Sequence, residues 1–303
     1  MAVAEVAEVP DHVARRSALR AAVVALRPRQ WLKNLLVFAG LVFASKLGDG
    51  GRWLDAVGAF AVYCAASSAA YLVNDLRDRE GDRQHPVKRF RPIAAGELAP
   101  RAAAATAVAL VAVAFGLAAA LGPWAPAFVA GFLALQAAYT LHLKHVVLVD
   151  VCCIAGLFVL RAAAGADAVD VRISPWLLAC TALLALFLAL AKRRGELVLV
   201  RAELTPGRRV LDGYSVALCE RLLQAASAAT VAAYVLYTLT SRDSKALAAT
   251  IPFVVAGVLR YLHLVHRHDL GEEPENVLLR DRPLLAAIGA WVAVAAVVLA
   301  TTS

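Results

Sequence analysis

Long apolar runs recur along this chain from residue 33 to residue 301, and they constrain its fold more than any other feature. Hydrophobic residues make up 61% of the chain. Since one bilayer crossing needs about 20 helical residues, the pattern predicts an all-α, polytopic membrane protein. We place nine spans, at residues 33–47, 54–73, 102–122, 124–142, 146–165, 174–191, 219–240, 246–264 and 283–301.

Positive charge decides whether the first and weakest run crosses the membrane. With nine crossings, 25 of the 31 Lys and Arg residues fall on the N-terminal side and 6 on the other side; without the first crossing the division becomes 19 to 12. Because cytoplasmic connections carry the excess of Lys and Arg, we expect nine spans. The N-terminus and the functional face then lie in the cytoplasm, and the protein is a multi-pass component of the inner (plasma) membrane.

The rest of the chain offers little outside this membrane domain. We expect a disordered N-terminal tail at 1–16 and one transmembrane domain at 17–303, with Ser17 capping a helix that runs to Arg27 on the membrane surface. The five cysteines show no CxxC or Cys/His spacing, so we expect neither a disulfide framework nor a zinc site. No nucleic-acid-binding motif accompanies the net charge of +8, and a homo-oligomer is left open.

The densest charge follows the second apolar run, in NDLRDREGDRQHPVKRFRPIAAG at 74–96, with four acidic and six basic residues. On a helix that continues this run, Asn74, Asp75, Asp78 and Asp82 share an arc of about 100°. Like charges at such spacing repel, so a cation that bridges them explains the pattern best. Oxygen ligands suit Mg²⁺, whose shell is completed by substrate phosphates. The alternative is a solvated, salt-bridged helix end.

The segment NDLRDREGD matches the NDxxDxxxD motif of the UbiA superfamily of intramembrane prenyltransferases. The chain most resembles the branch that transfers phosphoribose to decaprenyl phosphate. The resemblance runs through RPRQWLKN at 27–34, the block at 71–96, LKH at 143–145, LRAAAG at 160–165, AKRRGEL at 191–197 and GEEPENVLLRD at 271–281. It implies nine helices around a central cavity that opens to the cytoplasm and to the bilayer.

The resemblance also implies an activity. The 5-phosphoribosyl group of 5-phosphoribosyl 1-diphosphate would pass to a polyprenyl (decaprenyl) phosphate, with Mg²⁺ as cofactor and diphosphate as the leaving group, for cell-envelope arabinan precursors. Asp75, Asp78 and Asp82 would be catalytic. The expected metal ligands are Asn74, Asp75, Asp78, Asp82 and Glu196. The expected substrate-binding residues are Arg29, Lys33, His85, Lys88, Arg89, Arg91, Tyr139, Lys144, Arg161, Lys192 and Arg193.

Several of these residues have competing explanations. Relatives usually carry a second acidic motif where this chain has KRRGE at 192–196, so the number of Mg²⁺ ions is open. Arg29 and Lys33 are also placed to snorkel. His85 would equally order a turn before Pro86. Two further cases remain. Arg161 would bind substrate or would instead pair with Asp167 or Asp170, and the connection at 260–282 would form a lid over the site or a solvated, salt-bridged loop. That connection includes Glu272, Glu273, Arg280 and Asp281.

Three other functions compete with this one. A UbiA-type enzyme that moves a prenyl group to an aromatic or quinone-precursor acceptor would share the acidic motif. A transporter would need acids at mid-membrane depth, whereas these acids cluster at one surface. A soluble phosphoribosyltransferase is disfavoured because strands and helices do not alternate along the chain.

Overall fold

The computed structural model describes residues 16–43, 48–202, 209–240, 245–268, 277 and 280–301. Every predicted apolar run is helical in the part described, and no strand occurs there. The long α-helices are α3 (Gly50–Arg77), α5 (Pro100–Leu121), α6 (Ala125–Leu141), α7 (Val149–Ala168), α8 (Pro175–Arg201), α9 (Val216–Thr240), α10 (Ile251–His268) and α12 (Arg282–Thr301). The short elements are α1 (Ala18–Ala25), α2 (Ala39–Phe43), α4 (Arg79–Gln84) and the 3₁₀ helices η1 (Pro28–Phe38), η2 (Lys88–Phe90), η3 (Leu143–His145), η4 (Arg209–Gly213) and η5 (Lys245–Thr250).

The helices confirm an integral membrane protein. In the described part of the chain, seven helical segments are long and apolar enough to cross a bilayer, and α6 is a shorter apolar helix. The first predicted span consists of η1 followed by α2. The count of nine crossings therefore stays a prediction. Predicted and observed helix bounds agree closely at α12, which was expected at 283–301.

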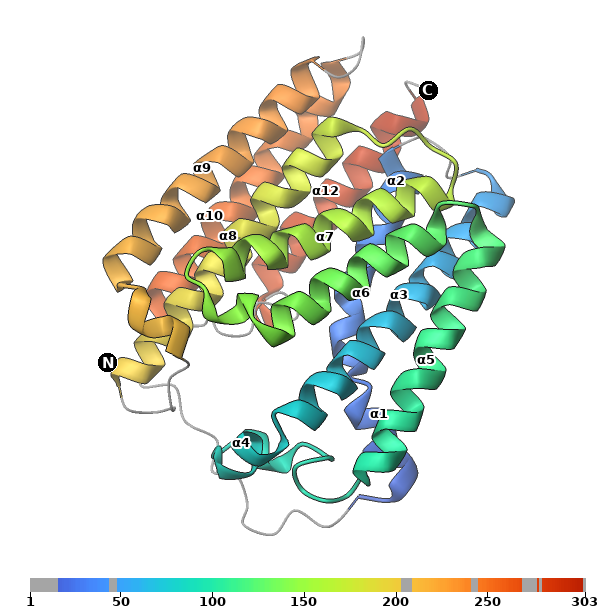
Figure 1. Cartoon of the computed structure of the whole chain (residues 1–303). Coiled ribbons are helices and arrows are strands. Elements are labelled where there is room, and N and C mark those ends of the chain that lie inside the picture. The colour runs from blue at the N-terminus through green and yellow to red at the C-terminus, as the bar shows by residue number, and fades with distance from the viewer. Residues whose placement is uncertain are drawn as a thin grey trace.

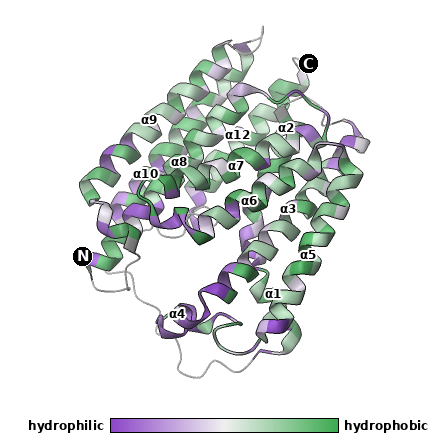
Figure 2. Cartoon of the chain, viewed as in Figure 1, coloured by the Kyte–Doolittle hydropathy of each residue, from purple (hydrophilic) through white to green (hydrophobic). Residues whose placement is uncertain are grey.

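The helices form one bundle in which successive helices run in opposite directions (Figure 1). At one end α3, α6 and α8 finish and α7 and α9 begin; we call this the α4 end, after the short helix that follows α3. Hydrophilic residues gather around α4, whereas the helical shafts are mostly hydrophobic (Figure 2). Large apolar side chains such as Leu54, Val108 and Leu259 are exposed on these shafts, as expected of a surface that faces lipid.

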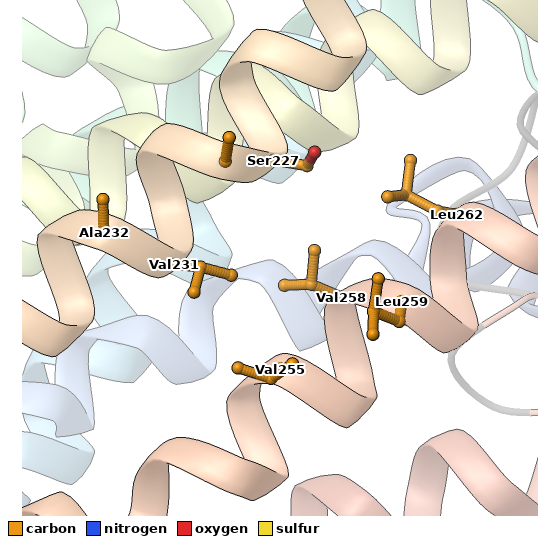
Figure 3. A pocket seen from close by; sticks show the side chains of 8 residues that line it. Ser227, Val231, Ala232, Val255, Val258, Leu259 and Leu262 are labelled. Carbon is orange, nitrogen blue, oxygen red and sulfur yellow. The ribbon is translucent and has the colours of Figure 1, made fainter.

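A hollow of about 450 Å³ lies between α9 and α10 (Figure 3). Its walls are apolar, with Val231 and Val258 among them. The hydroxyl of Ser227, which also lines it, donates to the backbone carbonyl of Gln224 at 2.8 Å. No charged residue lines this hollow, so it is separate from the polar site described below.

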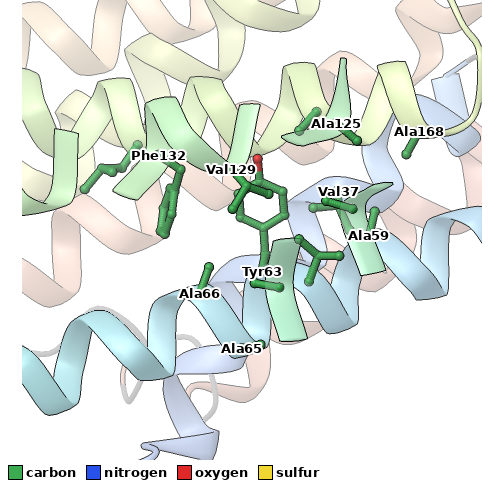
Figure 4. Close-up of a cluster of buried hydrophobic side chains, with 14 residues drawn as sticks. Val37, Ala59, Tyr63, Ala65, Ala66, Ala125, Val129, Phe132 and Ala168 are labelled. Atoms are coloured by element: carbon green, nitrogen blue, oxygen red, sulfur yellow. The ribbon is translucent and has the colours of Figure 1, made fainter. Parts of the chain in front are cut away.

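The first half of the bundle has its own core, formed by η1, α3, α5, α6 and α7 (Figure 4). Tyr63 of α3 meets Phe132 of α6 edge to face, with ring centroids 5.3 Å apart. Alanines fill most of the other positions in this cluster, which lets the helices approach closely, as small residues do in membranes. The second half packs α7 to α10 and α12 around Phe187 and Tyr261.

The irregular first run is held against α7 by small residues. A side chain added at Gly40 would lie 2.7 Å from the Cα atom of Ala166, and one added at Gly165 would overlap the backbone carbonyl of Val37. Backbone therefore packs on backbone here, which only glycine permits. Such close packing places η1, and the polar residues that begin it, beside α7.

Two smaller expectations have clear outcomes. Ser17 caps α1, because its hydroxyl accepts from the Arg20 amide at 3.4 Å; the predicted tail lies outside the described residues apart from residue 16. Trp291, in the middle of α12, donates its indole N–H to the Tyr234 hydroxyl at 2.7 Å. A tryptophan within a span is thus satisfied by a hydrogen bond between helices.

Gly165→Ala should destabilise the protein, whereas Gly116→Ala should leave it unchanged or stabilise it. Gly116 lies in α5 with open space around it, so the substitution there gains helix propensity of about 0.5–1 kcal/mol. At Gly165 the same methyl group must displace backbone, at a cost of about 1–3 kcal/mol. Thermal unfolding of the detergent-solubilised variants measures the difference, and equal midpoints would contradict the packing described.

Candidate active site

The acidic residues after α3 do not continue its helix, which corrects the helical wheel used above. α3 ends at Arg77, Asp78 occupies the junction with φ −87° and ψ 4°, and α4 begins at Arg79. The amide of Asp78 still donates to the Asn74 carbonyl at 2.9 Å. Asp78 pairs with Lys144, whereas Asp75 and Asp82 stay together, and cations from other segments offset the repulsion between them.

Asp75 and Asp82 converge on one guanidinium. The Nη1 atom of Arg91 lies 3.2 Å from an oxygen of Asp75 and 2.6 Å from an oxygen of Asp82. The two acids are only 2% and 4% exposed. Because buried charges are stable only when paired, Arg91 is what allows two carboxylates to lie together out of water.

Further cations surround these acids. Arg27 pairs with Asp75 at 2.5 Å and lies over the Tyr71 ring, 4.9 Å from its centroid. Its backbone has φ +55°, a strained conformation for a non-glycine residue that is often found at functional sites. Lys144, from η3, lies 3.3 Å from both oxygens of Asp78. The sequence prediction included Lys144 and Arg91 and missed Arg27, although RPRQWLKN begins with it.

Two of the predicted metal ligands, Asp75 and Asp82, are suited to bind Mg²⁺. Among the described residues no group of three or more His, Cys, Asp and Glu side chains lies close enough to hold a metal. Mg²⁺, however, is commonly held by one or two carboxylates together with substrate phosphates. Asp75 and Asp82 already share one cation, the Arg91 guanidinium, so their oxygens fit a positive charge between them. Asn74, which precedes Asp75 in α3, is half-buried, and Asp78 faces Lys144.

A second buried cluster lies where α7 begins and α8 ends. The Nε atom of Arg193 donates to an oxygen of Asp150 at 2.5 Å, and its Nη1 atom donates to Glu196. Its Nη2 atom lies 3.4 Å from the Tyr139 hydroxyl. All three donor groups of Arg193, which is 1% exposed, thus meet protein acceptors. Glu196, predicted as a metal ligand, is the partner of this arginine.

Asp150 and Tyr214 were not predicted. Asp150 is fully buried, and the Tyr214 hydroxyl donates to its second oxygen at 2.6 Å. The pKa of Tyr214 is raised by burial and by this hydrogen bond, so the hydroxyl stays protonated and can donate. The available signal was an aspartate just inside an apolar run, where a charge is costly and functional by default.

Arg161 does not pair with Asp167 or Asp170. Asp170 pairs with Arg52 at 3.2 Å. Arg161 is 4% exposed and donates to the amide oxygen of Asn34 at 2.8 Å, and no carboxylate in the described chain lies within ion-pair distance of it. Its charge also faces the Phe132 ring, at 4.6 Å from the centroid, which stabilises a desolvated cation. This hydrogen bond links α7, which contains Arg161, to η1, which contains Asn34, and both residues lie near the middle of their elements.

The other predicted substrate-binding residues lie around the α4 end. His85 orders its turn, because its Nδ1 atom accepts from the amides of Val87 and Lys88 at 3.2 and 3.3 Å. Arg89 is exposed and lies over the Phe90 ring, and Arg29 is exposed. Lys33 donates to Gln30 at 2.6 Å. Lys88 and Lys192 are half-buried.

The 260–282 connection is described only in part, and Glu272 and Glu273 lie outside the described residues. Asp281 accepts two hydrogen bonds from Arg260, at 3.1 and 2.7 Å, and this pairing lowers the pKa of its carboxyl. Asp281 also caps α12 at the Leu284 amide. The start of α12 is thereby held against the middle of α10, and Arg280, next to Asp281 in the chain, is exposed.

Comparison with known proteins extends these observations. Residues 35–280 match the UbiA prenyltransferase family. The decaprenyl-phosphate phosphoribosyltransferase of Mycolicibacterium smegmatis is 37% identical over 290 residues, 89% of each chain. The enzyme of that name from Mycobacterium tuberculosis is 38% identical over 281 residues, 89% of this chain and 91% of its own.

A solved structure shares the fold. A UbiA homolog from Archaeoglobus fulgidus bound to GPP and Mg²⁺ superposes with a TM-score of 0.72 at 21% identity, over 93% of this chain and 99% of its own. At this identity the likeness concerns the fold alone.

Glu196→Gln should lower the unfolding temperature more than Glu80→Gln. Each glutamate pairs with an arginine three residues away, but Glu80 is exposed and Glu196 is buried. Loss of charge at Glu196 leaves Arg193 with a weaker acceptor, at a cost of about 1–3 kcal/mol, against about 0–1 kcal/mol for the exposed pair. Thermal unfolding in detergent measures both. Equal midpoints with loss of metal binding at Glu196 alone would instead assign Glu196 to a metal.

Proposed function

Because this chain belongs to the UbiA prenyltransferase family, we propose that it transfers 5-phosphoribose from 5-phosphoribosyl 1-diphosphate to a polyprenyl phosphate, releasing diphosphate. Relatives that carry the name decaprenyl-phosphate phosphoribosyltransferase align along 89% of this chain, and decaprenyl phosphate is therefore the acceptor we propose. The observation in the fold that carries the proposal is the meeting of buried Asp75 and Asp82 with Arg27, Arg91 and Lys144 at one end of the bundle.

The number of cations favours a substrate with more than one anionic group. A prenyl diphosphate presents one diphosphate, whereas the sugar donor carries a diphosphate and a separate 5-phosphate, and the lipid acceptor adds a third anionic group. Residues 74–96 contain six basic residues, and Arg27 and Lys144 reach the same acids from other segments. Arginine offers two parallel hydrogen bonds to a phosphate and lysine a point charge.

The reaction we propose is a substitution at the anomeric carbon. The bond between C1 and the diphosphate oxygen breaks, and a bond forms between C1 and an oxygen of the lipid phosphate. That nucleophile is already anionic at neutral pH, so no general base is required. The chain's own contribution is to position the two substrates and to surround their phosphates with fixed positive charge.

Asp75 and Asp82, with Asp78 and Asn74 nearby, are the residues we assign to Mg²⁺. The bound ion would neutralise charge on the departing diphosphate. Arg91 now occupies the place between the two buried carboxylates, so it is free to contact a phosphate only when another cation replaces it there. Arg91 is in this way suited to link metal binding with substrate binding.

The distribution of charge along the chain also indicates which side of the membrane the polar end of the bundle faces. We propose that the α4 end faces the cytoplasm, because the excess of Lys and Arg along the chain falls on that side. The polyprenyl chain would lie among the apolar shafts. The product would supply pentose donors for cell-envelope arabinan.

The first test uses the purified protein in detergent with radiolabelled 5-phosphoribosyl 1-diphosphate and decaprenyl phosphate. Label should enter the organic phase with Mg²⁺ and should not do so with EDTA. The matched reaction replaces the sugar donor with a labelled prenyl diphosphate and an aromatic acceptor. Transfer in that reaction alone would overturn the proposal in favour of an ordinary UbiA-type prenyltransferase.

Asp82→Asn should lower kcat by at least about a hundredfold, because an amide supplies no negative charge to hold a divalent cation. The amide keeps an oxygen that faces Arg91, so folding should be preserved. Glu80→Gln, in the same short helix but exposed, is the control and should retain activity. Unchanged turnover in Asp82→Asn would remove this residue from the site, and an inactive Glu80→Gln would show that any change in α4 is harmful.

A further inference from the structure

The turn that carries Lys144 has an unusual backbone. Lys144 lies in η3, and four residues later Leu148 adopts φ +66° and ψ −36° before α7 begins. A leucine with positive φ is costly and persists only where its surroundings impose it. The place of Lys144 beside Asp78 thus depends on whatever holds Leu148.

The Tyr214 hydroxyl holds it. This oxygen accepts the N–H of Leu148 at 2.8 Å and donates its own proton to Asp150 at 2.6 Å. Gly213, the residue before Tyr214, lies so close to Val147 that a side chain at Gly213 would overlap it. Val147 and Leu148 are therefore held in place by Gly213 and Tyr214, which lie more than sixty positions further along the chain.

Asp150 is itself fixed from the other side. It is fully buried, and the carboxylate oxygen that does not face Tyr214 accepts the Nε–H of Arg193 at 2.5 Å. Arg193 in turn is held by Glu196 and Tyr139. A buried network in which every donor has an acceptor is rigid, so Tyr214 is attached to a firm support rather than to a mobile side chain.

We propose that Tyr214, supported by Asp150 and Arg193, is a positioning residue that sets the place of Lys144 at the carboxylate site. The inference rests on the proposed function, in which Lys144 contacts a phosphate of 5-phosphoribosyl 1-diphosphate. It assigns Arg193 to this support rather than to direct contact with substrate, since its donors are already engaged.

Tyr214→Phe is the variant that tests this, because it keeps the ring and removes both hydrogen bonds. KM for the sugar diphosphate should rise about tenfold, the effect of one lost hydrogen bond, with kcat changed less. The matched control is Tyr234→Phe, which removes a buried hydroxyl bonded to Trp291 and Thr250 in the second half of α9. That control should leave KM unchanged.

A double-mutant cycle separates positioning from general loss of structure. In a Lys144→Met background, Tyr214→Phe should change KM by less than about twofold, because residues that act through one another are not additive. An equal increase in both backgrounds would overturn the proposal.

Hydrogen–deuterium exchange keeps the inference testable without any activity. Amides in the peptide that spans residues 142–149 should exchange about tenfold faster in Tyr214→Phe and at the wild-type rate in Tyr234→Phe. Unchanged exchange in Tyr214→Phe would overturn the role of Tyr214. A wild-type protein that transfers no phosphoribose would overturn the proposed function, while the exchange result would still decide whether Tyr214 holds the turn.

Discussion

Asp75, Asp82 and Asp150 lie almost completely out of water, and an arginine meets each of them. A carboxylate in such surroundings is stable only with a cation and hydrogen bonds in good geometry. The arginines come from other segments: Arg91 from the connection after α4, and Arg193 from the end of α8. These pairings determine how the helix ends meet, and the polar end of the bundle depends on them.

The two halves of the bundle pair their buried carboxylates with arginines in opposite ways. At the end of α3 the helix supplies the carboxylates and a later connection supplies the arginine. At the end of α8 the helix supplies Arg193, and Asp150 arrives from the start of α7. A second acidic motif was expected from the family resemblance where this chain has KRRGE, and Arg193 of that segment is buried and paired with Asp150 and Glu196. A buried cation at this position organises its neighbours by gathering acceptors around it.

In the function that we propose, the residues that hold the site in place differ from those that bind substrate. Arg193 and Arg161 are buried with their donors directed at protein groups. Lys144, Arg27 and Arg91 pair with acids at the edge of the bundle, where an incoming polyanion can compete for them. A site for a substrate with several phosphates needs such exchangeable pairs, because a free cation cluster would repel itself.

Much of the fold follows from the chain alone. Apolar length and flanking charge placed α5 and α12 within a few residues, because helix formation depends on neighbours along the sequence and on the thickness of a bilayer. The end of α8 was predicted at residue 191 and lies at Arg201, since that helix continues past the apolar run through the charged KRRGE segment. The motif at Asp75, Asp78 and Asp82 identified the polar end. Tertiary structure alone decided that the helix breaks at Asp78, that Arg27 rather than Arg29 meets Asp75, and that Arg161 faces Asn34. Such pairs join residues tens of positions apart, so helix rotation and packing select them, and no local pattern records that choice.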